Sequence, residues 1–89
     1  MTQGTEAGAS PLAELLRAGQ LPPPAERRRI RLESGASLRL MGDELGVSQT
    51  AVHNWEKGID NPSPANAAKY RRLLDQLAEV AEYKARAAS

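Results

Sequence analysis

The stretch that decides the fold is LRLMGDELGVSQTAVHNWEK, residues 38–57. Its pattern predicts two short helices, one over about residues 38–45 and one over about residues 48–57. Gly46 is suited to the left-handed conformation that ends a helix, and Ser48 is a favourable N-cap for the second helix. Each helix has one apolar face, made by Leu38, Met41 and Leu45 in the first and by Val52 and Trp55 in the second.

Two short helices joined by a glycine turn form a helix-turn-helix motif. The second helix has a polar face opposite its apolar one, made by Gln49, Thr50, His53, Asn54 and Lys57. Gln and Asn side chains can pair bidentately with the adenine edge in the major groove of DNA. Because neutral hydrogen-bonding groups suit base reading better than charges do, this face favours base recognition. The alternative is an ordinary solvated helix face.

The segment GASLRLMGDELGVSQTAVHNWEKG, residues 35–58, resembles the Cro and phage-repressor type of helix-turn-helix regulators, also called the XRE family. The matching positions are Gly35, Ser37, Met41, Leu45, Gly46, Val47, Ser48, Val52, Trp55, Glu56 and Gly58. The resemblance covers roughly residues 30–64. It implies an all-α fold, a small bundle of four to five helices. It also implies a regulator that binds double-stranded DNA with its second motif helix.

The resemblance also assigns roles to single residues. An arginine at the position of Arg31 pairs in this family with the glutamate at the position of Glu56, so we expect a structural ion pair between them. Leu38 stands where the family often has a phosphate-binding Gln, and Arg39 is the neighbour that can replace it. Gly42 stands where the family usually has Ala, which should loosen the first helix by up to about 1 kcal/mol.

Composition limits the remaining function classes. The length of 89 residues allows one small domain. The chain includes no Cys and a single His, so we expect no metal site and no cofactor. An enzyme is not expected, because His53 has no obvious acid or nucleophile beside it. No apolar run is long enough for a membrane span, and we expect a cytoplasmic, nucleoid-associated protein. The net charge of only +1 predicts few phosphate contacts and a modest salt dependence of DNA binding.

The chain is expected to contain four segments. Residues 1–9 should be a disordered tail, and residues 10–21 a short helix over 11–18 followed by a linker. Residues 22–76 should form the DNA-binding domain, which begins with a charged helix over about 24–34. Residues 77–89 should extend a C-terminal helix beyond it. Six residues are candidates for phosphate contacts: Arg39, Ser48, Lys57, Arg27, Arg28 and Asn61.

Ser63 and Pro64 begin a helix that no Gly or Pro interrupts, and it should run to about Lys84. Alternating spacing of three and four residues along it is typical of a coiled-coil seam, which would be Tyr70, Leu73, Leu77, Val80 and Lys84. The candidates for dimerisation are therefore Leu77, Val80, Ala81 and Lys84. The alternative is that this end of the helix folds back on the segment 11–18.

Two function hypotheses follow. The first is a sequence-specific transcription regulator, a repressor by family resemblance, that binds two half-sites as a homodimer. The second is a protein-interaction module, such as an antitoxin that binds a partner protein as well as DNA. A tight heteromeric partner would favour the second hypothesis, and a homodimer alone would favour the first.

Overall fold

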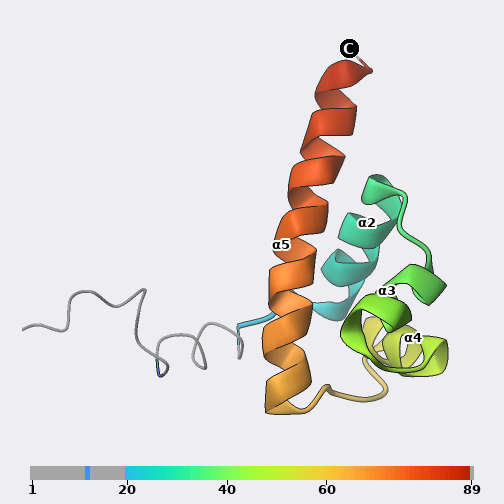
Figure 1. Cartoon of the computed structure of the whole chain (residues 1–89), viewed down its shortest axis with the longest axis vertical. Helices are drawn as coiled ribbons and strands as arrows, with labels where there is room; N and C mark the ends of the chain where they lie inside the picture. Colours follow the sequence, from blue (N-terminus) through green and yellow to red (C-terminus); the bar gives the residue numbers. More distant parts are fainter. Residues whose placement is uncertain (1–11, 13–19, 89) are drawn as a thin grey trace, which may run out of the picture.

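The computed structural model describes residue 12 and residues 20–88, which form helices joined by short turns (Figure 1). Helix α2 spans Pro24–Ser34, α3 Leu38–Leu45, α4 Gln49–Lys57 and α5 Pro64–Ala87. No strand occurs in this described part of the chain, and the predicted all-α helical fold is confirmed. The tail predicted over 1–9 and the short helix predicted over 11–18 lie outside the described residues, except for Leu12, which is exposed.

The helices begin and end at residues whose local chemistry favours a boundary. Serine N-caps precede three of them, and each Oγ accepts a backbone N–H from the first turn: Ser37 from Leu40, Ser48 from Ala51 and Ser63 from Asn66. At the other end of α3, Gly46 has a φ of 72°, which a residue with a Cβ rarely adopts. This glycine turn sets the angle between α3 and α4.

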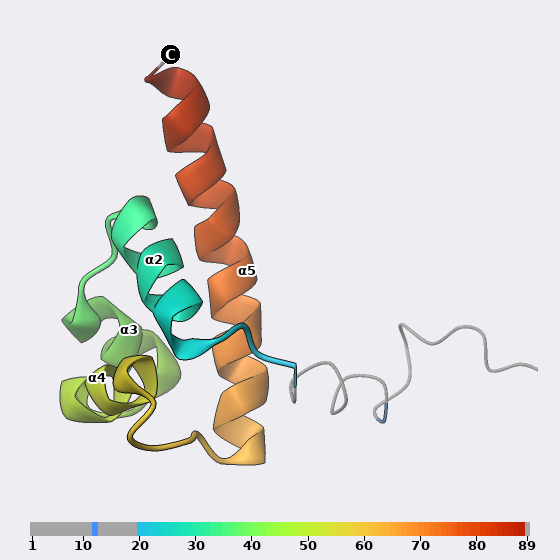
Figure 2. The same cartoon turned by 180° about the vertical axis from the view of Figure 1, so that it is seen from behind.

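The core lies where the long helix α5 meets the other three. Helix α2 lies beside α5, and the α3–α4 pair packs next to the N-terminal half of α5 (Figure 2). The buried apolar residues come from α3, α4, α5 and the α2–α3 turn, namely Ala36, Met41, Leu45, Val52, Trp55, Tyr70, Leu74 and Leu77. Because Phe is absent, Trp55 and Tyr70 supply the large rings of this core.

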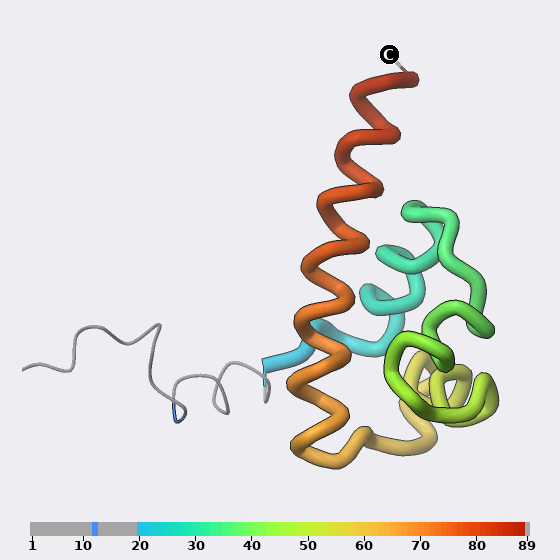
Figure 3. The backbone as a smooth tube through the Cα atoms, viewed as in Figure 1, coloured from blue at the N-terminus to red at the C-terminus, as the bar shows by residue number. Residues whose placement is uncertain are grey.

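Helix α5 is one continuous helix that runs past the end of α2 (Figure 3). The helix contacts the domain as far as Lys84, because Leu77 is only 9% exposed and Lys84 Nζ donates to the Ser34 carbonyl oxygen at 3.0 Å. The domain therefore extends past the boundary expected at residue 76. Two of the four expected dimerisation residues, Leu77 and Lys84, contact their own domain, since α2 lies along this part of α5.

Gly42 allows α3 to approach the beginning of α4 closely. A Cβ at this buried position would lie 2.7 Å from the Val47 carbonyl oxygen and 3.4 Å from the Gln49 backbone nitrogen. The sequence suggested only that glycine loosens α3. The structure shows a reason for its presence, since alanine would meet backbone atoms of the turn.

Candidate nucleic-acid interface

Helix α4 is fixed to the domain along one side. Val52 is fully buried, and Trp55 and Glu56 are 5% and 6% exposed. The three side chains share one face of the helix, so their packing fixes its rotation about its own axis. The opposite side of α4 is left facing outward.

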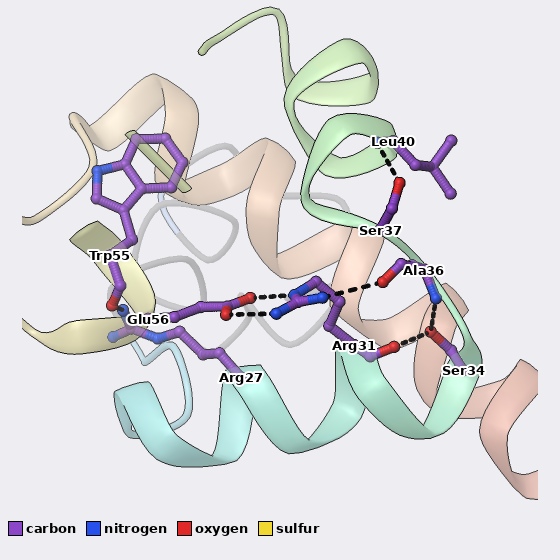
Figure 4. Close-up of polar contacts among 8 residues, drawn as sticks. All are labelled: Arg27, Arg31, Ser34, Ala36, Ser37, Leu40, Trp55 and Glu56. Carbon is purple, nitrogen blue, oxygen red and sulfur yellow. Dashed lines mark hydrogen bonds and ion pairs between the residues drawn. The ribbon is translucent and has the colours of Figure 1, made fainter. Parts of the chain in front are cut away.

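A buried ion pair attaches α4 to α2. Arg31 Nε donates to one carboxylate oxygen of Glu56 at 2.6 Å, and Arg31 Nη2 donates to the other at 3.0 Å (Figure 4). The remaining terminal nitrogen, Nη1, donates to the Ala36 carbonyl oxygen at 3.1 Å. This is the pair expected between Arg31 and Glu56, and its bidentate geometry resists rotation of either side chain.

A second buried arginine, Arg27, also contacts α4. Its Nη1 donates to the Trp55 carbonyl oxygen at 3.2 Å, and its Nε donates to the Pro22 carbonyl oxygen at 2.7 Å. The guanidinium also lies 5.8 Å from the centre of the Tyr70 ring, a favourable cation–π distance. Arg27 was expected to bind phosphate. The structure corrects this, because the side chain is only 8% exposed and its donors are used inside the domain.

The neighbouring arginines of α2 have different surroundings. Arg29 is exposed and pairs with Glu26 and Glu33, and its guanidinium lowers the pKa of the Glu26 carboxyl. Arg28 is exposed and remains a candidate for phosphate contact. The signal that sequence reasoning missed is the spacing of Arg27, Arg31 and Ser34, which recur on one face of α2 and are all buried.

The outer side of α4 carries the residues expected to read bases. Gln49, Thr50 and His53 are exposed, Asn54 is half-buried at the edge, and Lys57 is exposed at the end of the helix. Thr50, His53, Asn54 and Lys57 lie on the side opposite Val52 and Trp55, and Gln49 is exposed at the N-terminal end of the helix. Four of the five are hydrogen-bonding groups that carry no fixed charge, which is the chemistry that base edges require.

Three further candidates for phosphate contact, Arg39, Ser48 and Asn61, are exposed. Ser48 Oγ accepts the Ala51 N–H at 3.0 Å, and its own hydroxyl proton is left to donate outward. The Arg39 side chain is 80% exposed and lies 4.0 Å from the Asp43 carboxylate, which is beyond hydrogen-bond distance. Asn61 is exposed in the loop after α4.

The loop after α4 uses two of its backbone amides inside the protein. The N–H groups of Ile59 and Asp60 donate to the Asn54 carbonyl oxygen at 3.0 and 3.4 Å. These two amides cap the C-terminus of α4.

Tyr70 supports α4 from α5. Its ring centre lies 5.4 Å from that of Trp55, and the two planes are tilted by 38°. Burial, together with the negative charge of Glu56, raises the pKa of the Tyr70 hydroxyl to about 12. The phenol therefore stays neutral under physiological conditions.

These helices, with one side of α4 anchored and the other outward, define a helix-turn-helix protein. A family model described as helix-turn-helix matches residues 28–81. The chain belongs to this family, in its XRE and phage-repressor type, and is a DNA-binding transcription regulator. No curated protein and no solved structure matches the chain.

Two further features of the described residues bear on function. Their His, Asp and Glu side chains form no cluster of three or more that could hold a metal ion. None of their helices is both long and apolar enough to cross a membrane.

Proposed function

We propose that this regulator is a repressor that inserts α4 into the major groove of a specific operator. The observation that carries the proposal is the division of α4 into a buried side and an outward, largely neutral side. Gln49 and Asn54 are the residues proposed to pair with base edges, and Thr50 and His53 would add single hydrogen bonds. The choice of repression over activation rests on the family resemblance alone.

The DNA backbone would be held by few charges. Arg39, Lys57 and Arg28 are the exposed cations assigned to phosphates, with Ser48 and Asn61 as neutral donors. Three cations per chain predict that log K falls with log salt with a slope of about −3 per chain. Such a slope is consistent with the net charge of +1 and leaves specificity to base contacts.

Two copies would read a palindromic operator. In a two-fold dimer the half-sites lie about one helical turn, roughly 34 Å, apart. Each copy would present the same face of α4 to its own half-site, so the operator would carry the symmetry of the protein.

The test is a selection from random duplex DNA, followed by titration of the selected sequences. We expect a short palindrome that binds far more tightly than bulk DNA. Asn54→Ala should lose about 1–3 kcal/mol of discrimination at one position of each half-site. Asn66→Ala, which removes an amide from α5, should leave the preferred sequence unchanged. An unchanged motif and affinity for Asn54→Ala would refute base reading by α4.

A second candidate function is binding of a partner protein, as in an antitoxin. Val80 and Tyr83 favour it, because these large apolar side chains are 42% and 67% exposed on α5. Purification from the native host at moderate salt tests this candidate. A stoichiometric heteromeric partner would support it, whereas a homodimer without other proteins would oppose it.

A further inference from the structure

Within the described part of the chain, helix α5 presents a stripe of mostly exposed side chains along one side. Residues spaced alternately by four and three make up this stripe, in the order Lys69, Leu73, Gln76, Val80, Tyr83 and Ala87. Such spacing is the one at which a helix packs along a second helix. Leu73 is half-buried and the other five are exposed. The stripe differs from the seam expected from sequence, whose members Tyr70 and Leu77 are buried in the core.

One end of this stripe borders a groove. The groove has a volume of about 200 Å³ and lies between α3 and α5, lined by Glu44, Leu45, Lys69, Arg72, Leu73 and Gln76. Leu73 provides most of the apolar surface, because Leu45 is only 2% exposed, and the other four residues are polar or charged. This combination suits a tyrosine, whose ring packs on apolar or cationic groups while its hydroxyl meets a polar one.

The other end of the stripe carries such a side chain. Tyr83 is 67% exposed, but it cannot enter the groove of its own chain. Tyr83 and Lys69 are fourteen residues apart on one straight helix, which separates them by about 21 Å. A second copy of α5 that runs antiparallel to the first can bring its Tyr83 to this groove. Lys69 and Tyr83 each lie seven residues from Gln76, so an antiparallel pair centred on Gln76 places each Tyr83 at the other copy's groove.

Charges along one edge of the stripe favour the same arrangement. Arg72 and Glu79 are both exposed and lie seven residues apart, on the same side of α5. Equivalent edges meet in an antiparallel pair with two-fold symmetry. Arg72 of each copy would then lie near Glu79 of the other copy, so the contact forms twice.

We propose that the exposed stripe of α5 binds a second copy of this chain, antiparallel and centred on Gln76, with Tyr83 of each copy in the α3–α5 groove of the other. This inference rests on the proposed function in taking the regulator to act as a dimer. It is tested without DNA, so its failure leaves base reading by α4 untouched.

The experiment measures the dimer dissociation constant of the full chain by sedimentation equilibrium. Arg72→Glu and Glu79→Arg should each weaken the dimer about tenfold or more, because each change replaces two attractions with two repulsions. An equimolar mixture of the two variants should recover the affinity, since each chain then supplies what the other lacks. Arg28→Glu makes the same change of charge on α2, away from the stripe, and should leave the dimer dissociation constant unchanged. Circular dichroism of each variant confirms that the fold is retained.

A cross-linking measurement tests the register. The chain has no Cys, so Gln76→Cys should form a disulfide-linked dimer under mild oxidation, because the two residues meet at the symmetry axis. Asp75→Cys, which points to another side of α5, should not. A monomer at the highest soluble concentration, a dimer insensitive to both charge reversals, or equal cross-linking at positions 75 and 76 would each overturn the proposal.

Discussion

The two sides of α4 use their polar groups differently. On the inner side, the Glu56 carboxylate and the Trp55 carbonyl oxygen are bound by two buried arginines of α2. On the outer side, Gln49, Thr50 and His53 face outward. The comparison indicates that charge orients the helix within the domain, whereas neutral groups are left for an external ligand.

This division has a mechanical reason. A helix that reads base edges has to present its side chains at a defined angle, because hydrogen bonds have strict distance and angle limits. Both arginines act on the C-terminal half of α4, where their positive charge also complements the helix dipole. Substitutions on the inner side should therefore lower stability, and those on the outer side should change DNA binding alone.

The largest effect is expected for Glu56→Ala. Removing the carboxylate leaves Arg31 buried without a counter-charge, which should lower the free energy of unfolding by about 3–5 kcal/mol. Urea unfolding followed by Trp55 fluorescence measures this change. Lys57→Ala, at the adjacent residue on the outer side, should change stability by less than about 0.5 kcal/mol. Equal losses for the two variants would show that the two sides of α4 do not differ.

Arg27 and Arg28 provide the next comparison, since they are consecutive and chemically identical. Arg27→Ala should lower the free energy of unfolding by about 2 kcal/mol, because the Trp55 carbonyl oxygen loses a buried donor and Tyr70 loses a packing partner. Arg28→Ala should leave stability nearly unchanged and weaken DNA binding at low salt. Thermal melts and a salt titration of operator binding separate the two effects. The reverse pattern would return Arg27 to the phosphate-binding role expected from sequence.

Tyr70 makes the inner side sensitive to high pH. The raised pKa of about 12 lies above the ordinary value of 10.0, so the unfolded chain loses this proton at lower pH than the folded chain does. The contribution of Tyr70 to the free energy of unfolding is therefore complete below pH 10, and it should fall by about 2 kcal/mol as the pH rises toward 12. Tyr70→Phe should remove this part of the pH dependence. Unfolding measured for both proteins between pH 9 and 12 isolates the effect, and parallel curves would contradict it.

The sequence predicted the four helices α2 to α5 well because their boundaries depend on local chemistry. Ser48, Gly46 and Pro64 act within a turn of their own positions, so no knowledge of the tertiary structure is needed. The outer side of α4 was predictable for the same reason, since helical spacing fixes which residues share a face. The pairing of Arg31 with Glu56 came from the family resemblance.

The remaining features depend on how helices meet in space. Spacing alone does not say which of two consecutive arginines faces inward, and Arg27 was therefore assigned to phosphate. Leu77 and Lys84 were predicted to lie in a dimer interface. The sequence of either helix alone does not show how far α2 packs along α5. The role of Gly42 depends on a single distance across the turn, which composition and spacing do not contain.

Gly42→Ala is the smallest of these effects and the one for which propensity and packing disagree. Helix propensity alone predicts that alanine stabilises α3 by up to about 1 kcal/mol. The 2.7 Å approach of the new Cβ to the Val47 carbonyl oxygen requires the turn to move, and overpacking of this kind typically costs about 1–3 kcal/mol. We expect the second effect to dominate and the melting temperature to fall by a few degrees.

Asp43→Ala provides the matched control for this prediction, because it adds the same favourable residue at the next, exposed position of α3. It should raise the melting temperature slightly or leave it unchanged. The displaced turn leads directly into Ser48 and Gln49 at the beginning of α4. Gly42→Ala should therefore also weaken operator binding, although the residue is buried. A variant that is more stable and binds DNA normally would show that the turn tolerates the Cβ.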